Sequence, residues 1–328
     1  MPQPSILFVC DAGPEVGGGH VMRCLTLAAA LAERGVQPAF QRSTAVDAIL
    51  DAFAPPGLAR ADAAAPADFT ALAFDHYGLA ADDHRRLAGG RPTLVVDDLA
   101  NRPLAADLVL DSGPSRRAAD YAGLVPPRAR LLIGPAHAPV RPQFAALREA
   151  ALQRRGGEGP VKRLLVSMGL TDVGGITEQV IRRLLPSLGE IAVDVVLGAR
   201  APSLPALRAL GDADRRIVLH IDTSDMARLT LGADAAVGAG GSTTWERCVL
   251  ALPTLQVTLA DNQREAAAAV AAAGAALVAD GFGPDFDDAA ARLLGDPALR
   301  SSLSGAAASL CDGQGAGRVA DAVLAMLG

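Results

Sequence analysis

The segment Gly17–Arg23 combines glycine, histidine and arginine directly after the hydrophobic run Ser5–Cys10. Gly18 and Gly19 allow the backbone to come close to a ligand, and the helix expected to begin there offers free N–H groups and a positive dipole end. His20 at the helix start can exchange protons near neutral pH. The segment is neither a Walker loop nor G-x-G-x-x-G. The segment therefore predicts a ligand contact with a proton acceptor, and the alternative is that His20 only caps the helix or fills a turn.

A second candidate segment, Asp75–Gly78, follows the hydrophobic run Ala71–Phe74. Tyr77 is one of only two tyrosines in the chain. Asp75 and His76 are neighbours on an extended strand, so their side chains point to opposite faces and are not expected to share a proton. We expect a substrate contact from His76 or Tyr77, and for Asp75 the alternative is a structural role.

In the second half of the chain, Ser167–Asp172 and Gly238–Glu246 share one pattern, in which a strand-like run is followed by a glycine turn, hydroxyl side chains and a helix. N–H groups at a helix start can hold a diphosphate without a metal, and the hydroxyl groups of Ser242 and Thr243 can add hydrogen bonds. Glu246 can accept hydrogen bonds from a ribose diol. The alternative is a helix cap in which Thr243 and Glu246 form a capping box.

The remaining polar segments give weaker signals. Asp261–Gln263 follows Thr254–Leu259 and opens an alanine-rich helix, where capping is the alternative to ligand binding. Gly313–Gly317 has no strand before it and is interpreted as a turn, and Asp212–Asp214 is interpreted as a solvated loop. No cluster of His, Cys and carboxylate residues has the spacing of a zinc site, so no metal and no cofactor are expected.

These segments need a scaffold, and the chain alternates short hydrophobic runs with helical patterns along its whole length, which predicts parallel βα units. Strands are expected at Ser5–Cys10, Val36–Gln41, Ala71–Asp75, Thr93–Asp97, Leu108–Asp111, Arg130–Ile133, Arg163–Ser167, Ala192–Leu197, Ile217–Ile221, Ala233–Val237 and Thr254–Val257. The longest apolar stretch, Ala266–Ala279, is shorter than the ~20 residues that span a bilayer and is expected to be a packed helix.

The length of 328 residues predicts about two domains. The glycine-rich, charged segment Arg154–Pro160 is expected to be an exposed hinge between residues 1–155 and 156–328. The fold class is therefore α/β, with two doubly wound, Rossmann-like domains facing an interdomain cleft. The carboxyl ends of both parallel sheets would meet at that cleft, where ligands of such sheets usually bind.

Composition excludes several functions. The formal net charge of −6 argues against a general nucleic-acid surface, and a single lysine, Lys162, leaves little room for Schiff-base chemistry. The four cysteines form no C-x-x-C pair, which is typical of reduced thiols in the cytoplasm. The first residues lack the charged start and the length of a secretory leader. We expect no membrane anchor, no nucleic-acid partner and no obligate protein partner.

Taken in order, the motifs resemble the family of UDP-2,4-diacetamido-2,4,6-trideoxy-β-L-altropyranose hydrolases, which act in pseudaminic acid biosynthesis and so in flagellin glycosylation. The resemblance covers nearly the whole chain and implies the two-domain GT-B fold. The motifs that carry it are Gly17–Leu25, Asp75–Gly78, Asp97-Asp98, Asp120–Pro126, Met168-Gly169, Thr171-Asp172, Gly241–Cys248 and Asn262-Gln263.

The resemblance also implies roles for single residues. His20 matches the general base that prepares water for attack on the anomeric carbon, and Tyr77 matches a tyrosine of the sugar site. Asn262 matches an asparagine at the diphosphate, and Ile221 lies where the fold would place uracil. The expected substrate- and UDP-binding residues are Gly18, Gly19, Arg23, Asp75, Gly169, Thr171, Ile221, Ser242, Thr243, Glu246, Asn262 and Gln263. The first domain would then bind the sugar and the second would bind UDP.

Three segments depart from the family pattern. Leu170 replaces a glycine of the family's Met-Gly-Gly-Thr-Asp turn, Gly174–Thr177 replaces an Asn-containing helix start, and His137–Arg141 lacks a tyrosine. We expect a metal-independent, inverting hydrolase that splits the anomeric C–O bond of the UDP-sugar. The alternatives are a GT-B glycosyltransferase, which would need an acceptor-docking face that the first half does not indicate, and a UDP-sugar-binding module, which would have no evident use for His20.

Overall fold

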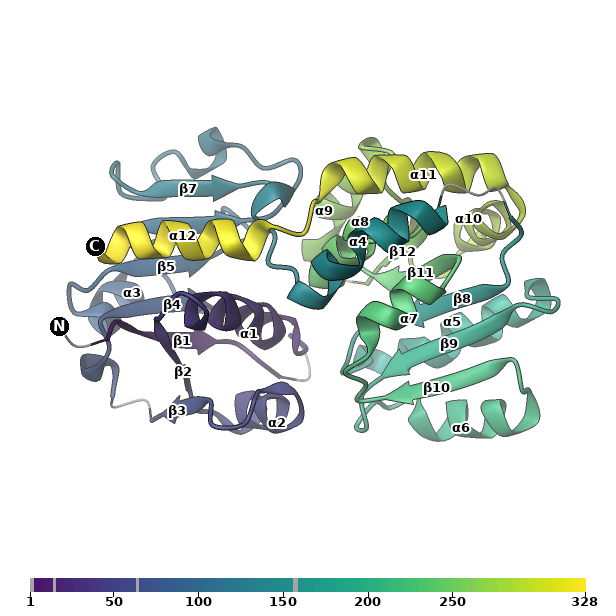
Figure 1. Ribbon diagram of the computed structural model, residues 1–328, viewed down its shortest axis with the longest axis horizontal. Helices are drawn as coiled ribbons and strands as arrows, with labels where there is room; N and C mark the ends of the chain where they lie inside the picture. The colour runs from purple at the N-terminus through teal and green to yellow at the C-terminus, as the bar shows by residue number, and fades with distance from the viewer. Residues whose placement is uncertain (1–2, 14–15, 63–64, 156–158, 260) are drawn as a thin grey trace. The chain divides into compact units, whose positions relative to one another are not determined.

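The structure is a computed structural model that describes residues 3–13, 16–62, 65–155, 159–259 and 261–328 (Figure 1). The chain forms two compact units. Unit 1 contains Met1–Val140 and Gln314–Gly328, and unit 2 contains Arg141–Gly313.

Unit 1 is built on a seven-stranded parallel sheet with the strand order β3-β2-β1-β4-β5-β6-β7. Its strands are β1 (Ser5–Cys10), β2 (Gln37–Gln41), β3 (Ala59–Ala61), β4 (Ala71–Asp75), β5 (Thr93–Val96), β6 (Leu108–Asp111) and β7 (Arg130–Ile133). Its α-helices are α1 (Gly19–Ala32), α2 (Thr44–Phe53), α3 (Ala81–Ala88) and α12 (Gly315–Leu327). The central strands are buried on both faces, because helices cover a parallel sheet on both sides.

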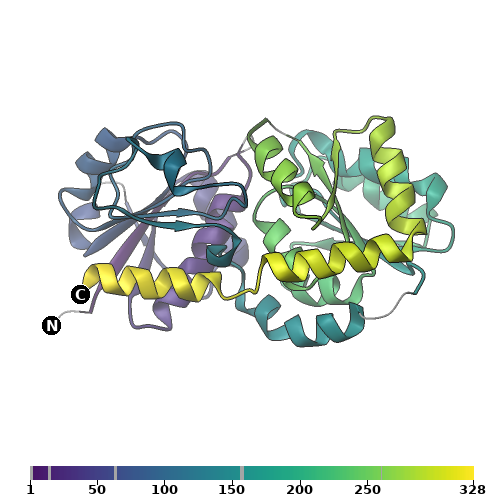
Figure 2. The ribbon, with the colours of Figure 1, turned by 90° about the horizontal axis from the view of Figure 1, so that it is seen from above.

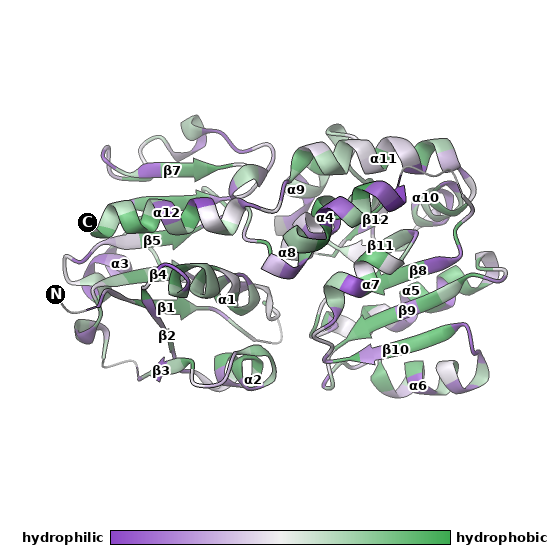
Figure 3. Cartoon of the chain, in the orientation of Figure 1, coloured by the Kyte–Doolittle hydropathy of each residue, from purple (hydrophilic) through white to green (hydrophobic). Residues whose placement is uncertain are grey.

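Unit 2 has a six-stranded parallel sheet with the order β10-β9-β8-β11-β12-β13. Its strands are β8 (Arg163–Ser167), β9 (Ala192–Leu197), β10 (Ile217–Ile221), β11 (Ala235–Ala239), β12 (Thr254–Thr258) and β13 (Leu277–Asp280). Its α-helices are α4 (Pro142–Arg155), α5 (Ile176–Leu184), α6 (Leu204–Ala213), α7 (Met226–Gly232), α8 (Ser242–Val249), α9 (Asp261–Ala272), α10 (Pro284–Gly295) and α11 (Pro297–Leu310). The central strands of both sheets are strongly hydrophobic (Figure 3).

The C-terminal helix α12 belongs to unit 1, where it packs on α1 and β6 (Figure 2). Its buried residues Ala316, Val319, Ala320 and Val323 follow the spacing of one helical face. Gly315 is required at its start, because a Cβ there would collide with the backbone of Ala138. The predicted turn before the last helix lies at Gly313-Gln314, where Gly313 has φ +81°, and Gly315–Gly317 already belong to α12.

The units divide the chain differently from the expected boundary at 155/156. Unit 2 begins at Arg141. The reason is that α4 packs within unit 2, where Phe144 and Ala151 are buried and Arg148 donates hydrogen bonds to the carbonyl oxygens of Val249, Cys311 and Ala308. Residues 156–158 of the expected hinge lie outside the described residues.

One predicted element was wrong. The apolar stretch Ala266–Ala279 is not a single helix, because α9 ends at Ala272 and Leu277–Asp280 forms the edge strand β13. Gly274, with φ +70°, makes the turn between them. Among the described residues, no helix is both long and apolar enough to cross a bilayer.

In each sheet the strand order reverses between two central neighbours, β1 and β4 in unit 1 and β8 and β11 in unit 2. In open α/β sheets, ligands bind outside the carboxyl ends of the strands at such a switch point. The loops that follow these four strands are therefore where a site is expected in each unit.

Candidate functional site

The switch point of unit 1 brings together residues that are far apart in sequence. His20 lies on the first turn of α1, directly after the β1 loop, and Asp75 is the last residue of β4. His20 Nδ1 lies 3.1 Å from the carbonyl oxygen of Asp75 and 2.9 Å from its Oδ1. Both neighbours are acceptors, so Nδ1 carries the proton and Nε2 keeps its lone pair free to accept another.

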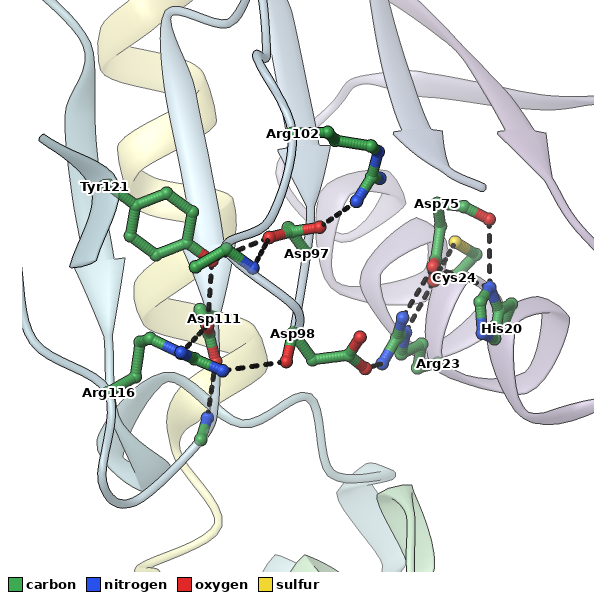
Figure 4. Close-up of polar contacts among 12 residues, drawn as sticks. His20, Arg23, Cys24, Asp75, Asp97, Asp98, Arg102, Asp111, Arg116 and Tyr121 are labelled. Carbon is green, nitrogen blue, oxygen red and sulfur yellow. Dashed lines mark hydrogen bonds and ion pairs between the residues drawn. The ribbon is translucent and has the colours of Figure 1, made fainter. Parts of the chain in front are cut away.

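Arg23 holds the Asp75 carboxylate from the next turn of α1 (Figure 4). Its Nε and Nη2 each donate to one carboxylate oxygen of Asp75 at 2.6 Å, and its Nη1 donates to Asp98 Oδ2 at 3.0 Å. The side chain of Asp75 is only 1% exposed. A forked arginine pair of this kind fixes both the charge and the orientation of the carboxylate.

The same contacts shift the proton affinities of the pair. Burial alone would raise the pKa of Asp75, but the charges of Arg23 and His20 and their hydrogen bonds lower it well below the usual value. Burial alone would lower the pKa of His20, but the Asp75 carboxylate outweighs burial and raises it above 6.5. Asp75 is therefore a permanent anion that favours proton uptake by His20.

Tyr77 and Asp98 lie beside His20 and Arg23, respectively. The rings of His20 and Tyr77 meet edge to face, with centroids 4.6 Å apart. Burial and the nearby Asp98 carboxylate raise the pKa of Tyr77, so its hydroxyl keeps its proton. Asp98 Oδ1 is buried and has no hydrogen-bond partner among the described residues. Because Oδ2 is paired with Arg23 and the Asp98 side chain is 33% exposed, Oδ1 is an acceptor within reach of a ligand donor.

A second carboxylate network lies further along the edge of the sheet (Figure 4). The Tyr121 hydroxyl lies 2.7 Å from Asp111 Oδ2 and 3.0 Å from Asp97 Oδ2. Arg116 donates to Asp111 and Arg102 donates to Asp97. Arg116 also donates to the carbonyl oxygen of Asp98. This network anchors the loops after β5 and β6 and so holds Asp98 in place.

In unit 2, the glycine loop after β11 leads into α8 at the switch point. Gly241, with φ +119°, precedes the first helical residue Ser242. Ser242 and Thr243 are half-buried, and α8 has no side-chain cap, so the capping-box alternative is wrong. The first N–H groups of α8 and two hydroxyl side chains therefore lie where an anion could bind.

Glu246, which was expected to accept hydrogen bonds from a ribose diol, is paired with an arginine of the same unit. Its two carboxylate oxygens accept hydrogen bonds from Arg141 Nε at 2.6 Å and Nη2 at 3.0 Å. The Glu246 side chain is 9% exposed. A ribose diol can use only the remaining lone pairs, so Arg141 is a further residue of this site. Arg141 is the last residue of His137–Arg141, the segment that lacks the tyrosine of the family pattern.

The other predicted residues of unit 2 follow or end strands of its sheet: Gly169 and Thr171 lie on the loop after β8, Ile221 ends β10, and Asn262 and Gln263 belong to the first turn of α9. Gly169 has φ +106°, and Thr171 is half-buried. Gln263 Oε1 accepts from the backbone N–H of Leu259 at 3.1 Å, which makes it a loop anchor. The side chain of Asn262 lies outside the described residues, although its backbone belongs to α9.

The structure thus brings His20, Arg23, Asp75 and Tyr77, four of the predicted site residues, together in one cluster. Sequence reasoning assigned no role to Asp98, Arg141 or Arg247, although each stands beside or within a quoted motif. Within the described ranges, no group of three His, Cys, Asp or Glu residues is arranged to hold a metal ion.

Comparisons with known proteins confirm the resemblance seen in the motifs. The chain is 24% identical over 285 residues to the UDP-2,4-diacetamido-2,4,6-trideoxy-β-L-altropyranose hydrolase of Campylobacter jejuni, across 82% of this chain and 97% of that protein. It is 28% identical over 197 residues to the spore coat polysaccharide biosynthesis protein SpsG of Bacillus subtilis, across 58% of this chain and 57% of that protein. No protein-family model matches the chain.

Solved structures confirm the predicted GT-B fold. MurG of Acinetobacter baumannii superposes with a TM-score of 0.67 at 17% identity, covering 99% of this chain and 100% of that one. The spinosyn rhamnosyltransferase SpnG gives a TM-score of 0.62 at 16% identity, covering 97% and 99%. The UDP complex of MnaA from S. aureus gives 0.63 at 14% identity, covering 98% and 96%.

Proposed function

We propose that this protein hydrolyses the anomeric C–O bond of UDP-2,4-diacetamido-2,4,6-trideoxy-β-L-altropyranose, releasing UDP and the free sugar. The observation that carries the proposal is the His20–Asp75–Arg23 array at the switch point of unit 1. Similarity to the Campylobacter jejuni hydrolase over 82% of the chain supports the choice of substrate.

His20 acts as the general base in this proposal. Its Nδ1 donates to Asp75, which leaves Nε2 to accept a proton from water. As the proton arrives, the Asp75 carboxylate stabilises the imidazolium, and Arg23 keeps that carboxylate ionised and fixed. Such an oriented base contributes about 10²- to 10⁴-fold to a rate.

Tyr77 and Asp98 bind the sugar beside this base. The Tyr77 hydroxyl keeps its proton and can donate to a sugar oxygen, while Asp98 Oδ1 can accept from a hydroxyl or an acetamido N–H group. A donor on the substrate would satisfy the buried oxygen of Asp98. Gly19 leaves room for a ligand at the start of α1, since a Cβ there would meet nothing within 4 Å, and Gly18 is the N-cap before it.

Unit 2 binds UDP in this proposal. The diphosphate takes the N–H groups at the start of α8 and the hydroxyl groups of Ser242 and Thr243, with Asn262 close by. Glu246, held by Arg141, takes the ribose, and the surrounding residues are Gly169, Thr171, Ile221 and Gln263. Helix ends that meet the charge of UDP make it a competent leaving group.

The test is incubation of the purified protein with this UDP-sugar and no acceptor, with UDP and free sugar followed by ³¹P and ¹H NMR. A hydrolase releases both in equal amounts. A glycosyltransferase of the same fold needs an added acceptor, and a binding module retains the sugar nucleotide intact. Either of the last two results would refute the proposal.

A matched variant separates the base from a structural histidine. His20→Ala should lower turnover by about 10²- to 10⁴-fold with UDP affinity unchanged. His137 also bonds a backbone carbonyl through Nδ1, that of Ile133 at 3.1 Å, but it is no part of the array. His137→Ala should keep full turnover, so equal losses in the two variants would remove His20 from its proposed role.

A further inference from the structure

Arg247 is a buried cation without a carboxylate partner. It lies near the end of α8, is 3% exposed, and forms no ion pair with any carboxylate in the described parts of the chain. Burial lowers its pKa to about 10. The unfolded chain would solvate this charge fully, so the folded unit carries a desolvation cost, which hydrogen bonds to neutral oxygens and the charge of Glu246 offset only in part.

The guanidinium lies directly under the glycine loop. A Cβ on Gly238 would stand 2.6 Å from Arg247 Nη1 and 3.0 Å from the carbonyl oxygen of Ser167, so a larger residue there would displace the guanidinium. Nη2 donates to the carbonyl oxygen of Ala239 at 3.0 Å and to Thr244 Oγ1 at 3.2 Å. The positive charge is thus held against the loop that leads into the start of α8.

The third contact fixes the direction of a hydroxyl group. Arg247 Nη1 donates to Thr243 Oγ1 at 3.1 Å, so this oxygen accepts and its own proton must point elsewhere. Within the described residues, the Thr243 hydroxyl has no acceptor of its own. Thr244 differs, because its hydroxyl reaches Gln256 Oε1 at 3.1 Å. Thr243 therefore presents a free O–H donor at the helix start.

We propose that Arg247 is the residue that makes the start of α8 selective for a diphosphate, by turning the Thr243 hydroxyl into a donor and by supplying an unbalanced positive charge. Arg247 is a positioning residue that acts through Thr243 and the loop. This role rests on the proposed function, since the diphosphate is that of UDP. The bound anion supplies the countercharge that the folded unit lacks.

The test compares charged and uncharged ligands of the full chain by calorimetry. The probes are UDP, uridine and inorganic pyrophosphate, and the variants are Arg247→Met, Arg247→Lys, Thr243→Val and the double variant Arg247→Met/Thr243→Val. Arg300→Met is the matched control, because Arg300 is also buried in unit 2 and donates to the carbonyl oxygens of Leu293, Leu294 and Gly159.

Arg247→Met should weaken UDP and pyrophosphate binding about 10- to 100-fold, as expected when a charge-assisted contact is lost, while uridine binding stays the same. Arg247→Lys should restore part of the UDP affinity, because it keeps the charge but not the fork. The losses in the double variant should be less than additive. Arg300→Met should bind all three ligands like the wild type.

The other possible results distinguish a failure of the role of Arg247 from a failure of the proposed function. Equal losses for UDP and uridine, additive losses, or unchanged UDP binding in Arg247→Met would overturn the role of Arg247 and leave the proposed function standing. Wild-type protein that binds pyrophosphate but not UDP would refute the nucleotide assignment alone. Wild-type protein that binds neither would refute both. If Arg247→Met does not fold, Arg247→Lys and Thr243→Val decide the question by the same UDP-to-uridine ratio.

Discussion

Replacing Asp75 by asparagine removes one buried charge while keeping the size of the side chain. The Asp75 carboxylate accepts two hydrogen bonds of 2.6 Å from Arg23 and lies 2.9 Å from His20 Nδ1, with 1% of its side chain exposed. In Asp75→Asn, the buried Arg23 would keep only Asp98 as an anionic partner. Breaking a buried pair by removing one partner typically costs about 3 to 5 kcal/mol.

That cost is a large part of the stability of one unit. It corresponds to a fall of about 6 to 20 °C in the midpoint of thermal unfolding for a unit of this size. Asp321→Asn is the control, because Asp321 also pairs with an arginine of unit 1, Arg34, but its side chain is 67% exposed. An exposed pair contributes about 0 to 1 kcal/mol, so the control should move the midpoint little.

The difference between wild type and Asp75→Asn should depend on pH. The pKa of folded Asp75 is lowered, so its stabilisation is present above the unfolded value near 3.9 and is lost as the pH falls through the folded value. Because Asp75 favours protonation of His20, the difference should grow between pH 7 and 5 as His20 takes up its proton in the wild type, and it should shrink at pH 3, as measured by scanning calorimetry. A difference that stays the same down to pH 3, or that matches the one for Asp321→Asn, would refute this reasoning.

The remaining predictions concern activity. Because a general base must be neutral and the pKa of His20 is raised, kcat/KM should fall as the pH drops through a value above 6.5. In Asp75→Asn, any residual activity should show this acidic fall at a lower pH. A fall at the same pH in both proteins would contradict the effect of Asp75 on the pKa of His20. Activity should survive EDTA, because helix N–H groups and hydroxyl side chains are proposed to meet the diphosphate charge, and a loss restored by Mg²⁺ or Mn²⁺ would reject that account. Asp98→Asn should raise KM about 10- to 100-fold, because it removes a carboxylate oxygen that is proposed to accept from the substrate; an unchanged KM would place the sugar elsewhere.

The scaffold follows from the sequence because parallel, doubly buried strands leave short hydrophobic runs that are easy to recognise. β1, β4 and β8 have the bounds that their runs predict. The short edge strand β3 (Ala59–Ala61) gives no such run, and β13 is hidden within an alanine-rich stretch. Edge strands are half-exposed and short, so their composition resembles that of loops and helices.

The site was predictable only in part. His20 and Asp75 each follow a strong strand signal, so topology alone brings them to one edge of the sheet. The roles of Arg141 and Arg247 depend on which acceptor each guanidinium reaches. Arg141 reaches Glu246, 105 residues further along the chain, and Arg247 reaches Thr243 on the same helix. No spacing rule encodes the contact between Arg141 and Glu246, whereas Thr243 and Arg247 stand four residues apart on α8, a spacing that makes side chains neighbours on a helix. The domain boundary was missed for a similar reason, since α12 returns to unit 1 through packing on α1.

The central claim is that water, activated by His20, attacks the anomeric carbon while the diphosphate stays intact. Hydrolysis in ¹⁸O-labelled water, followed by mass spectrometry of both products, tests it directly. The label should appear in the anomeric oxygen of the released sugar, with none in UDP. Label in a nucleotide phosphate, or release of UMP with a sugar phosphate, would contradict the account.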